Sequence, residues 1–129
     1  MTRVKVYARD HWLPAARPTM SEAIQAAVVS ALEYPPEKWV HRFFPMSEDD
    51  FVWGFDRSDR YTIVEVSMFT GRSPETKRRL IMGLFANLQE AVGLQPNDLE
   101  ITIVETPREN WGIRGLPGNE VGLDYRVDV

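Results

Sequence analysis

The segment Phe55–Leu80, FDRSDRYTIVEVSMFTGRSPETKRRL, decides how the rest of the chain is arranged. It contains a charged loop, an apolar run from Tyr61 to Phe69, a turn ending in Arg72 and the start of a helix. Apolar residues occupy both faces of the run, which is typical of a central strand in an α/β sheet. Arg72 lies where the strand gives way to the helix, and open α/β sheets commonly bind ligands there. Arg72 is therefore the first candidate site residue.

The composition predicts one globular domain over residues 1–129. The chain has a net charge of −4 and no cysteine. An acidic balance argues against general nucleic-acid binding, which needs a basic surface. No apolar run approaches ~18 residues, so we expect no membrane span and no signal peptide, and a cytoplasmic protein. His11 and His41 lack metal-type spacing, so we expect neither a metal nor a cofactor.

Hydrophobic periodicity predicts two helices and several strands. The first helix is expected to start at a capping box, Thr19-Met20-Ser21-Glu22, and to stop before Pro35-Pro36. The second should start at Ser73 and end at Gly93. Besides the central run, strands are expected at Arg3–Tyr7, Trp39–Phe44, Leu99–Glu105 and in the tail at residues 125–129. Alternating aromatics at Phe51, Trp53 and Phe55 indicate a short strand or hairpin arm.

The chain repeats itself at an offset of 60 residues, with Val4-Lys5-Val6 matching Val64-Glu65-Val66. Each half, about 1–60 and 61–129, reads as strand, helix, strand. We expect an α/β (α+β) fold in which two β-α-β repeats form a four-stranded mixed sheet with two helices on one face. The face carrying Val64, Val66 and Met68 would then be bare, which predicts a subunit interface and a closed oligomer.

These features resemble the tautomerase superfamily, and within it the malonate semialdehyde decarboxylase-like branch. The residues that carry the resemblance are VSMFTGRSPETKRRL, GLQPNDLEITIVE and ENWGIRG, between Val66 and Gly115. Bacterial members that lack the amino-terminal proline, with FDRSD before the strand and a WG-x-RG segment, are more similar still. The resemblance implies a homotrimer with three sites between neighbouring subunits.

The superfamily's enzymes use an amino-terminal proline as acid or base, and Thr2 occupies that position here. The Thr2 nitrogen is an amide while Met1 precedes it. Removal of Met1 would leave a primary amine with an ordinary pKa of about 8 and no ring to fix its geometry.

The other active-site residues that the resemblance implies are only partly present in this chain. Of two turn arginines in the decarboxylase, only Arg72 is present, with Thr70 at the other position. Lys38 matches the catalytic aspartate, Trp111 matches an active-site tryptophan, and Ile113 replaces a phenylalanine. Arg114 lies beside them in a glycine-rich segment that could form a pocket wall.

Each candidate also has a structural interpretation. Arg72 can bind a carboxylate with help from the helix N-terminus, or it can pair structurally with Asp56, Asp59 or Glu105. Trp111 and Arg114 could pack between subunits, and Lys38 could be an ordinary exposed lysine.

Two functions therefore stay open. One is a keto–enol tautomerase, isomerase or related lyase acting on a small carboxylate-bearing substrate, with Arg72 and Thr2 as catalytic residues and Arg72, Trp111, Arg114 and Lys38 binding the substrate. The other is a catalytically inactive trimer that binds a small anion or acts as a scaffold.

Overall fold

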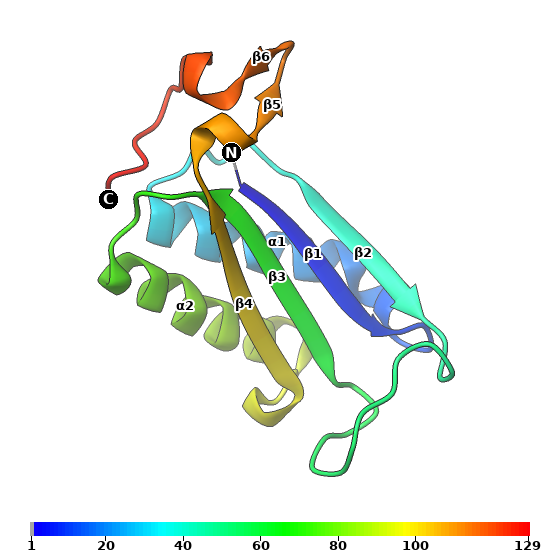
Figure 1. The fold of residues 1–129 in the computed structure, drawn as a ribbon. Coiled ribbons are helices and arrows are strands. Elements are labelled where there is room, and N and C mark those ends of the chain that lie inside the picture. Colours follow the sequence, from blue (N-terminus) through cyan, green and yellow to red (C-terminus); the bar gives the residue numbers. More distant parts are fainter. Residues whose placement is uncertain (1) are drawn as a thin grey trace.

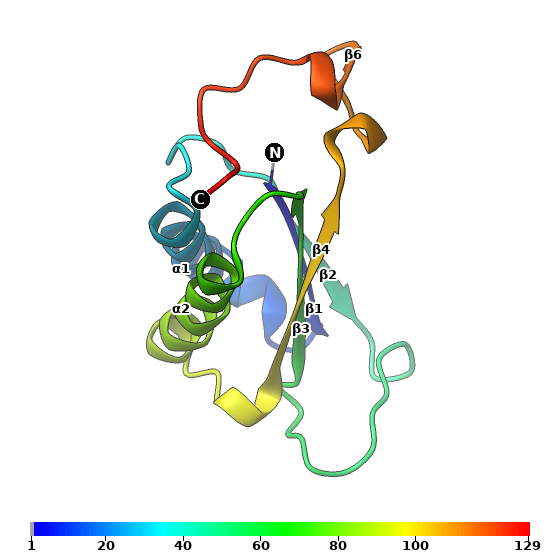
Figure 2. The same ribbon diagram turned by 60° about the vertical axis from the view of Figure 1, so that its left-hand side comes forward.

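The computed structural model describes residues 2–129 as a mixed sheet with two helices packed on one face (Figures 1 and 2). Its main elements are β1 (Thr2–Arg9), α1 (Leu13–Leu32), β2 (His41–Met46), β3 (Thr62–Phe69), α2 (Pro74–Val92) and β4 (Leu99–Thr106). The second half continues through a short hairpin of β5 (Gly112–Ile113) and β6 (Leu116–Pro117). Single 3-10 turns are formed by Pro96–Asp98, Arg108–Asn110 and Gly118–Glu120.

The strand order β2-β1-β3-β4 confirms the predicted central strand and the repeat. β1 runs parallel to β2, and β3 runs parallel to β4, as each β-α-β unit requires. β1 and β3 pair antiparallel across the middle of the sheet, with Val4 opposite Val66. The bounds of β3 repeat those of β1 at an offset of 60 residues. The two halves are therefore related by an approximate twofold axis through the β1–β3 pair.

The prediction for the bare face of the sheet was wrong. Val64, Val66 and Met68 are fully buried in the core that both helices cover. The helix-free face carries the alternate residues of the strands, including Lys5, Tyr7, Ile63, Glu65 and Ser67, which are only partly buried. The more apolar face of β3 packs on the helices because that is where burial removes most apolar surface from water.

Helix α1 begins at Leu13, so the predicted start at Thr19 was also wrong. Pro14 stands in the first turn, where the missing amide hydrogen costs nothing. Pro18 lies inside the helix and cannot donate to the Pro14 carbonyl, but the Arg17 Nε donates to that carbonyl at 3.1 Å. The Pro14 carbonyl therefore keeps a donor although Pro18 supplies none.

Helix α2 begins and ends as predicted. The Ser73 hydroxyl accepts a hydrogen bond from the Thr76 amide at 3.2 Å, and Pro74 follows in the first turn. Gly93 ends the helix in the left-handed region at φ 70°.

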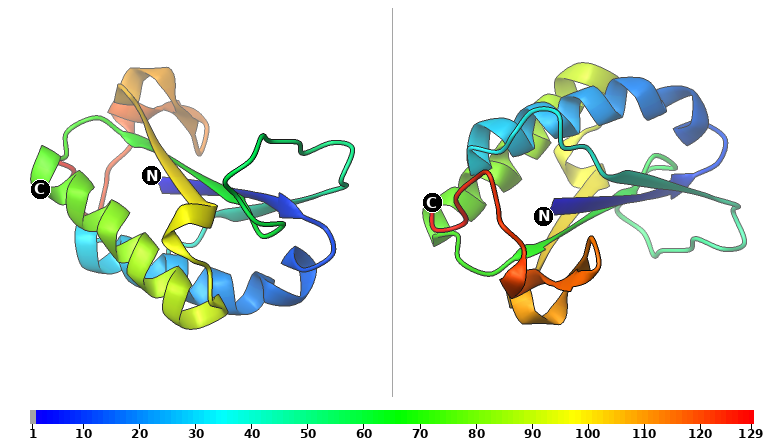
Figure 3. Two further views of the ribbon diagram at one scale, coloured as in Figure 1. Left: turned by 90° about the horizontal axis from the view of Figure 1, so that it is seen from below. Right: turned by 90° about the horizontal axis from the view of Figure 1, so that it is seen from above.

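Two predicted strands are absent from residues 2–129. The segment 47–61 between β2 and β3 is irregular, although Phe51, Trp53 and Tyr61 form an aromatic cluster with centroids 5.1–5.6 Å apart. Phe55 at its tip is 95% exposed. The tail at 125–129 is also irregular and ends beside the start of α2 (Figure 3). Neither helix is long and apolar enough to cross a membrane within the described residues.

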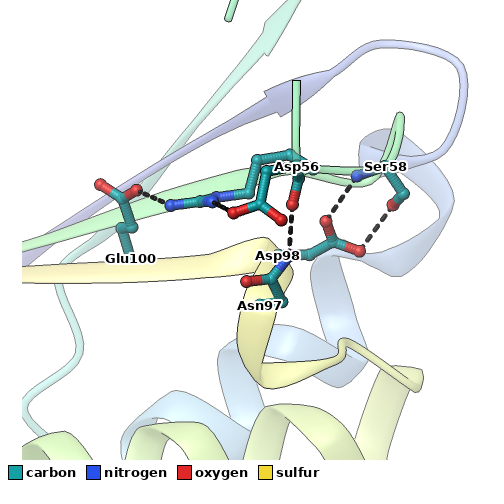
Figure 4. Close-up of polar contacts among 6 residues, drawn as sticks. Asp56, Ser58, Asn97, Asp98 and Glu100 are labelled. Atoms are coloured by element: carbon teal, nitrogen blue, oxygen red, sulfur yellow. Dashed lines mark hydrogen bonds and ion pairs between the residues drawn. The ribbon is translucent and has the colours of Figure 1, made fainter. Parts of the chain in front are cut away.

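The charged FDRSD loop anchors the entry to β3 (Figure 4). Arg57 contacts Asp56 at 3.2 Å and Glu100 of β4 at 2.7 Å. The Asp98 carboxylate accepts from the Ser58 amide at 2.8 Å and from its hydroxyl at 2.6 Å. These contacts fix the start of β3 against the start of β4, so their role is structural.

Candidate functional site

The turn after β3 places Arg72 directly before α2. Gly71 adopts φ 137°, and a Cβ there would lie 2.9 Å from the Val127 backbone oxygen. Only glycine fits this close approach of the tail without strain. The Ser73 amide donates to the Val129 oxygen at 2.9 Å, so the tail also uses one free amide of the helix N-terminus.

The Arg72 side chain is buried and largely unsatisfied. It is 4% exposed, and its Nη1 donates to the Phe69 carbonyl at 3.4 Å. Its Nε and Nη2 have no hydrogen-bond partner among residues 2–129. Burial lowers the pKa of Arg72, while Tyr125, Tyr34 and Glu105 act in the opposite direction. A buried guanidinium with free donors is costly alone and is well suited to an anion.

The three carboxylates considered as structural partners of Arg72 all contact other basic side chains. Asp56 pairs with Arg57 at 3.2 Å, and Asp59 lies 3.3 Å from His11. Glu105 pairs with Lys77 of α2 at 2.7 Å. The donors of Arg72 are therefore left for something other than these side chains.

Thr2 begins β1 opposite Met68, at the same end of the sheet as Arg72. It is 4% exposed, and its backbone nitrogen donates to the Tyr34 hydroxyl at 3.1 Å. Its own hydroxyl oxygen is buried without a partner among residues 2–129. Thr2 thus faces the helix side of the sheet, beneath the end of α1.

Tyr125 and Lys38 close this end of the molecule. The Tyr125 ring meets the Tyr34 ring edge-on at 4.7 Å, and the Arg72 guanidinium lies 6.0 Å from its centroid. The Lys38 ammonium lies 5.9 Å from the same centroid and 3.4 Å from Asp124. Burial and the neighbouring Tyr34 raise the pKa of Tyr125, so its hydroxyl is neutral at physiological pH. Two cations and two phenols therefore surround one buried region.

Trp111 and Arg114 lie apart from this region. Trp111 packs on the Phe69 ring at 5.0 Å and under the Arg3 guanidinium at 4.3 Å, on the helix-free side of the sheet. It borders an open hollow of about 480 Å³ formed mainly by the β5–β6 hairpin. Arg114 is exposed at φ 52° in the turn of that hairpin. Within one subunit, Thr2, Arg72 and Lys38 lie around the Tyr34–Tyr125 pair, while Trp111 and Arg114 do not join them.

Sequence reasoning missed Tyr34 and Tyr125. Tyr34 follows a predicted helix end, but nothing local indicates that it turns back to Thr2. Tyr125 was assigned to a tail strand because it alternates with Val127 and Val129. Both contacts join segments at least 32 residues apart, and neither segment carries a motif that would reveal them.

Comparison with known proteins defines the class. A family model described as "Tautomerase enzyme" matches residues 38–114, more than half of the chain. The 2-hydroxymuconate tautomerase of Comamonas testosteroni is 38% identical over 58 residues, covering 45% of this chain and 92% of that protein. The same enzyme of Pseudomonas putida is 34% identical over 58 residues, with the same coverage.

Solved structures agree in fold. Native fused 4-OT superposes with a TM-score of 0.83 at 17% identity, covering 94% of this chain and 99% of that one. Malonate semialdehyde decarboxylase superposes with a TM-score of 0.79 at 20% identity, covering 89% and 93%. This chain belongs to the tautomerase family, and the resemblance noted from its sequence is confirmed.

Proposed function

We propose that this chain is a keto–enol tautomerase or a related lyase that binds a small carboxylate-bearing substrate at Arg72. The observation that carries the proposal is the Arg72 guanidinium, 4% exposed with two nitrogens unpaired in residues 2–129. A substrate carboxylate would accept hydrogen bonds from both nitrogens and recover the cost of burying the charge. Family membership makes tautomer chemistry the natural use of such an anion site.

The Thr2 nitrogen is the proposed proton carrier once Met1 is removed. In tautomerisation the enol hydroxyl gives its proton to a base, and a proton is delivered to a carbon of the substrate, so no oxidant or reductant is needed. The amine lies in a buried region that also contains the cation of Arg72, which would favour its neutral, basic form. Arg72 would meanwhile hold the carboxylate.

A homotrimer is part of this proposal. Fused 4-OT variants of similar fold are described as trimers. In such an assembly Trp111 and Arg114 of one subunit could complete the site of a neighbour and shield it from water. A cytoplasmic location remains a prediction from the sequence.

One observation favours the second candidate function, an inactive member that binds a small anion or acts as a scaffold. Thr2 stands where the superfamily's enzymes have proline, and its nitrogen donates to Tyr34 within a regular strand. While Met1 is attached, that nitrogen has no basic lone pair. The anion site at Arg72 does not depend on Met1, so binding without turnover is chemically consistent.

The test begins with mass spectrometry of the natively expressed N-terminus. Proteins with and without Met1 are then assayed with phenylenolpyruvate, beside Arg72→Ala and, as a matched control, Arg57→Ala at the opposite end of the sheet. The proposal predicts turnover only without Met1, and loss of that turnover in Arg72→Ala alone. Absence of turnover with either N-terminus, with ligand binding retained, would support the inactive binder.

A further inference from the structure

We propose that Tyr34 is the positioning residue of the site: its hydroxyl holds the Thr2 nitrogen and sets the direction of its lone pair. This inference rests on the proposed function because it concerns the amine exposed when Met1 is removed. The carrying observation is the 3.1 Å hydrogen bond from the Thr2 nitrogen to the Tyr34 hydroxyl, between a residue that is 4% exposed and one that is 3% exposed.

The backbone around Tyr34 is built to turn this side chain back toward the sheet. Glu33 ends α1 in the left-handed region at φ 51°, an unusual conformation for a residue other than glycine. The Tyr34 amide then reaches back to the Val29 carbonyl at 3.4 Å, and Pro35 and Pro36 restrict the chain that follows. The ring is held edge-on by Tyr125 at 4.7 Å. The phenol is therefore placed by rigid surroundings.

A threonine amine needs such a partner. An amino-terminal threonine has free rotation about its N–Cα bond, whereas the ring of a proline fixes that bond. A phenol can accept a hydrogen bond from the amine while donating its own hydrogen elsewhere. The contact with Tyr34 contributes to the raised pKa of Tyr125, and the phenol oxygen of Tyr34 has two lone pairs, so it can accept from the Thr2 nitrogen as well. One hydrogen bond thus supplies part of the geometric restraint that a ring would give.

The charged and titratable groups around this nitrogen come from three segments. They are Arg72 from the turn before α2, Tyr34 and Lys38 from the segment after α1, and Asp124 and Tyr125 from the tail. Accepting a hydrogen bond from an ammonium favours the charged amine, so the Tyr34 hydroxyl raises the pKa of the Thr2 amine. Arg72 acts in the opposite direction.

The experiment uses full-length protein whose first residue is Thr2, released from a cleavable tag and verified by mass. The pKa of the Thr2 amine is measured by NMR titration in wild type and in Tyr34→Phe, which keeps the ring and removes the hydroxyl. Tyr7→Phe is the matched control, because Tyr7 stacks on Phe44 at 4.8 Å on the helix-free face. We expect Tyr34→Phe to lower the pKa of the amine by roughly half a unit to one unit, and Tyr7→Phe to leave it unchanged.

Turnover gives a second, independent readout. Tyr34→Phe should lower kcat/KM for phenylenolpyruvate about tenfold, mainly through kcat. Thr2→Pro should make Tyr34 dispensable, because the ring now fixes the nitrogen. Adding Tyr34→Phe to Thr2→Pro should therefore change kcat/KM less than twofold, roughly within measurement error.

The outcomes separate the two proposals. An amine pKa that is the same in wild type and Tyr34→Phe would overturn the role of Tyr34 and leave Arg72 as an anion site. Inactive Thr2→Pro protein would contradict the proposed catalysis, while the titration still decides the role of Tyr34. Should Tyr34→Phe fail to fold, hydrogen exchange of the Thr2 amide in wild type with Met1 attached replaces it. Rapid exchange there would show that Tyr34 does not hold this nitrogen.

Discussion

The two halves of the molecule share a backbone plan but differ in the side chains at its two ends. One end of the sheet gathers Thr2, Arg72 and Tyr34. The positions 60 residues away in the repeat lie at the opposite end and are Thr62, Trp12 and Leu94. Thr62 is satisfied there by donating to the Arg60 carbonyl at 2.8 Å, and the Arg60 guanidinium stacks on Trp12 at 4.5 Å.

This difference shows that the repeat supplies two equivalent ends and that the side chains make only one of them a candidate site. Leu94 is 1% exposed and fills its position with carbon atoms, whereas Tyr34 presents a hydroxyl to Thr2. Trp12 replaces the cation of Arg72 with an indole. The following variants test whether these substitutions account for the difference between the two ends.

The largest effect is expected from Arg72→Leu. This variant replaces the buried cation by an apolar side chain, as Trp12 does at the equivalent position of the other end. Loss of the buried guanidinium should weaken binding of phenylpyruvate, a stable carboxylate analogue, by about 100-fold or more. Stability should rise by about 1–2 kcal/mol because an unpaired buried charge is removed. Titration calorimetry and urea unfolding measure the two effects. Arg57→Leu is the control for binding, and unchanged affinity in Arg72→Leu would refute the anion site.

The next effect concerns His41, whose repeat partner is Ile101. Burial lowers the pKa of His41 to about 4, and its Nδ1 lies 3.1 Å from the Ser21 hydroxyl. The unfolded chain binds a proton near pH 6.5 and the folded chain does so only near pH 4, so stability falls as pH drops through this window. The free energy of unfolding should fall by less than about 3 kcal/mol, since solvent around the partly exposed ring reduces the effect.

The replacement His41→Ile introduces the residue found at the equivalent position of the second half, Ile101. It should reduce the pH dependence of stability. Urea unfolding at pH 7.5, 5.5 and 4 measures the pH dependence of stability, and His11→Gln, at an exposed contact with Asp59, should keep most of it. A slope in His41→Ile equal to that of wild type would assign the pH dependence to other groups.

Gly71→Ala tests the close contact between the turn and the tail, which the first half lacks. A Cβ at φ 137° and 2.9 Å from the Val127 oxygen must displace the tail. We expect a loss of about 2 kcal/mol and faster proteolysis of the tail. Gly54→Ala is the control, because a Cβ there meets no atom within 4 Å. Equal stability of the two variants would mean that the tail does not pack on Gly71 in solution.

The smallest effect is expected at the helix starts. Within residues 2–129, Ser73 supplies the only side-chain cap at the start of a long helix, so Ser73→Ala should cost about 1 kcal/mol. Thr19→Ala, in the sequence that resembles a capping box but lies inside α1, should be neutral or slightly stabilising. Thermal unfolding compares the stability of the two variants. A larger loss of stability in Thr19→Ala than in Ser73→Ala would contradict the observed helix start.

Most of the fold could be predicted from the sequence because the signals are local and occur twice. The repeat, the central strand and the Ser73 cap depend on spacing within a few residues. The start of α1 could not be predicted, since Pro18 ordinarily ends a helix and the Arg17 compensation is visible only in three dimensions. The helix-facing side of β3 is hard to predict because apolar residues occupy both faces of the strand, and only Glu65 and Ser67 mark the helix-free side.

The candidate site was only partly predictable. Arg72 follows from a strand, a turn and a helix cap that adjoin in sequence. Tyr34, Lys38 and Tyr125 meet through the course of the tail, which has no regular structure and therefore no periodic signal. Trp111 and Arg114 were expected beside Arg72, yet within one subunit they lie on the other side of the sheet or in an exposed turn.

The segment 47–61 is the covalent link between the two β-α-β units. The β1–β3 pairing and the packing of α1 on α2 hold the same two units together without covalent bonds. A backbone cleaved at the exposed Gly54 should therefore stay assembled as two complementing fragments. One fragment would carry Thr2 and Tyr34, and the other would carry Arg72 and Tyr125. Because neither fragment holds the whole site, carboxylate binding would report their reassociation directly.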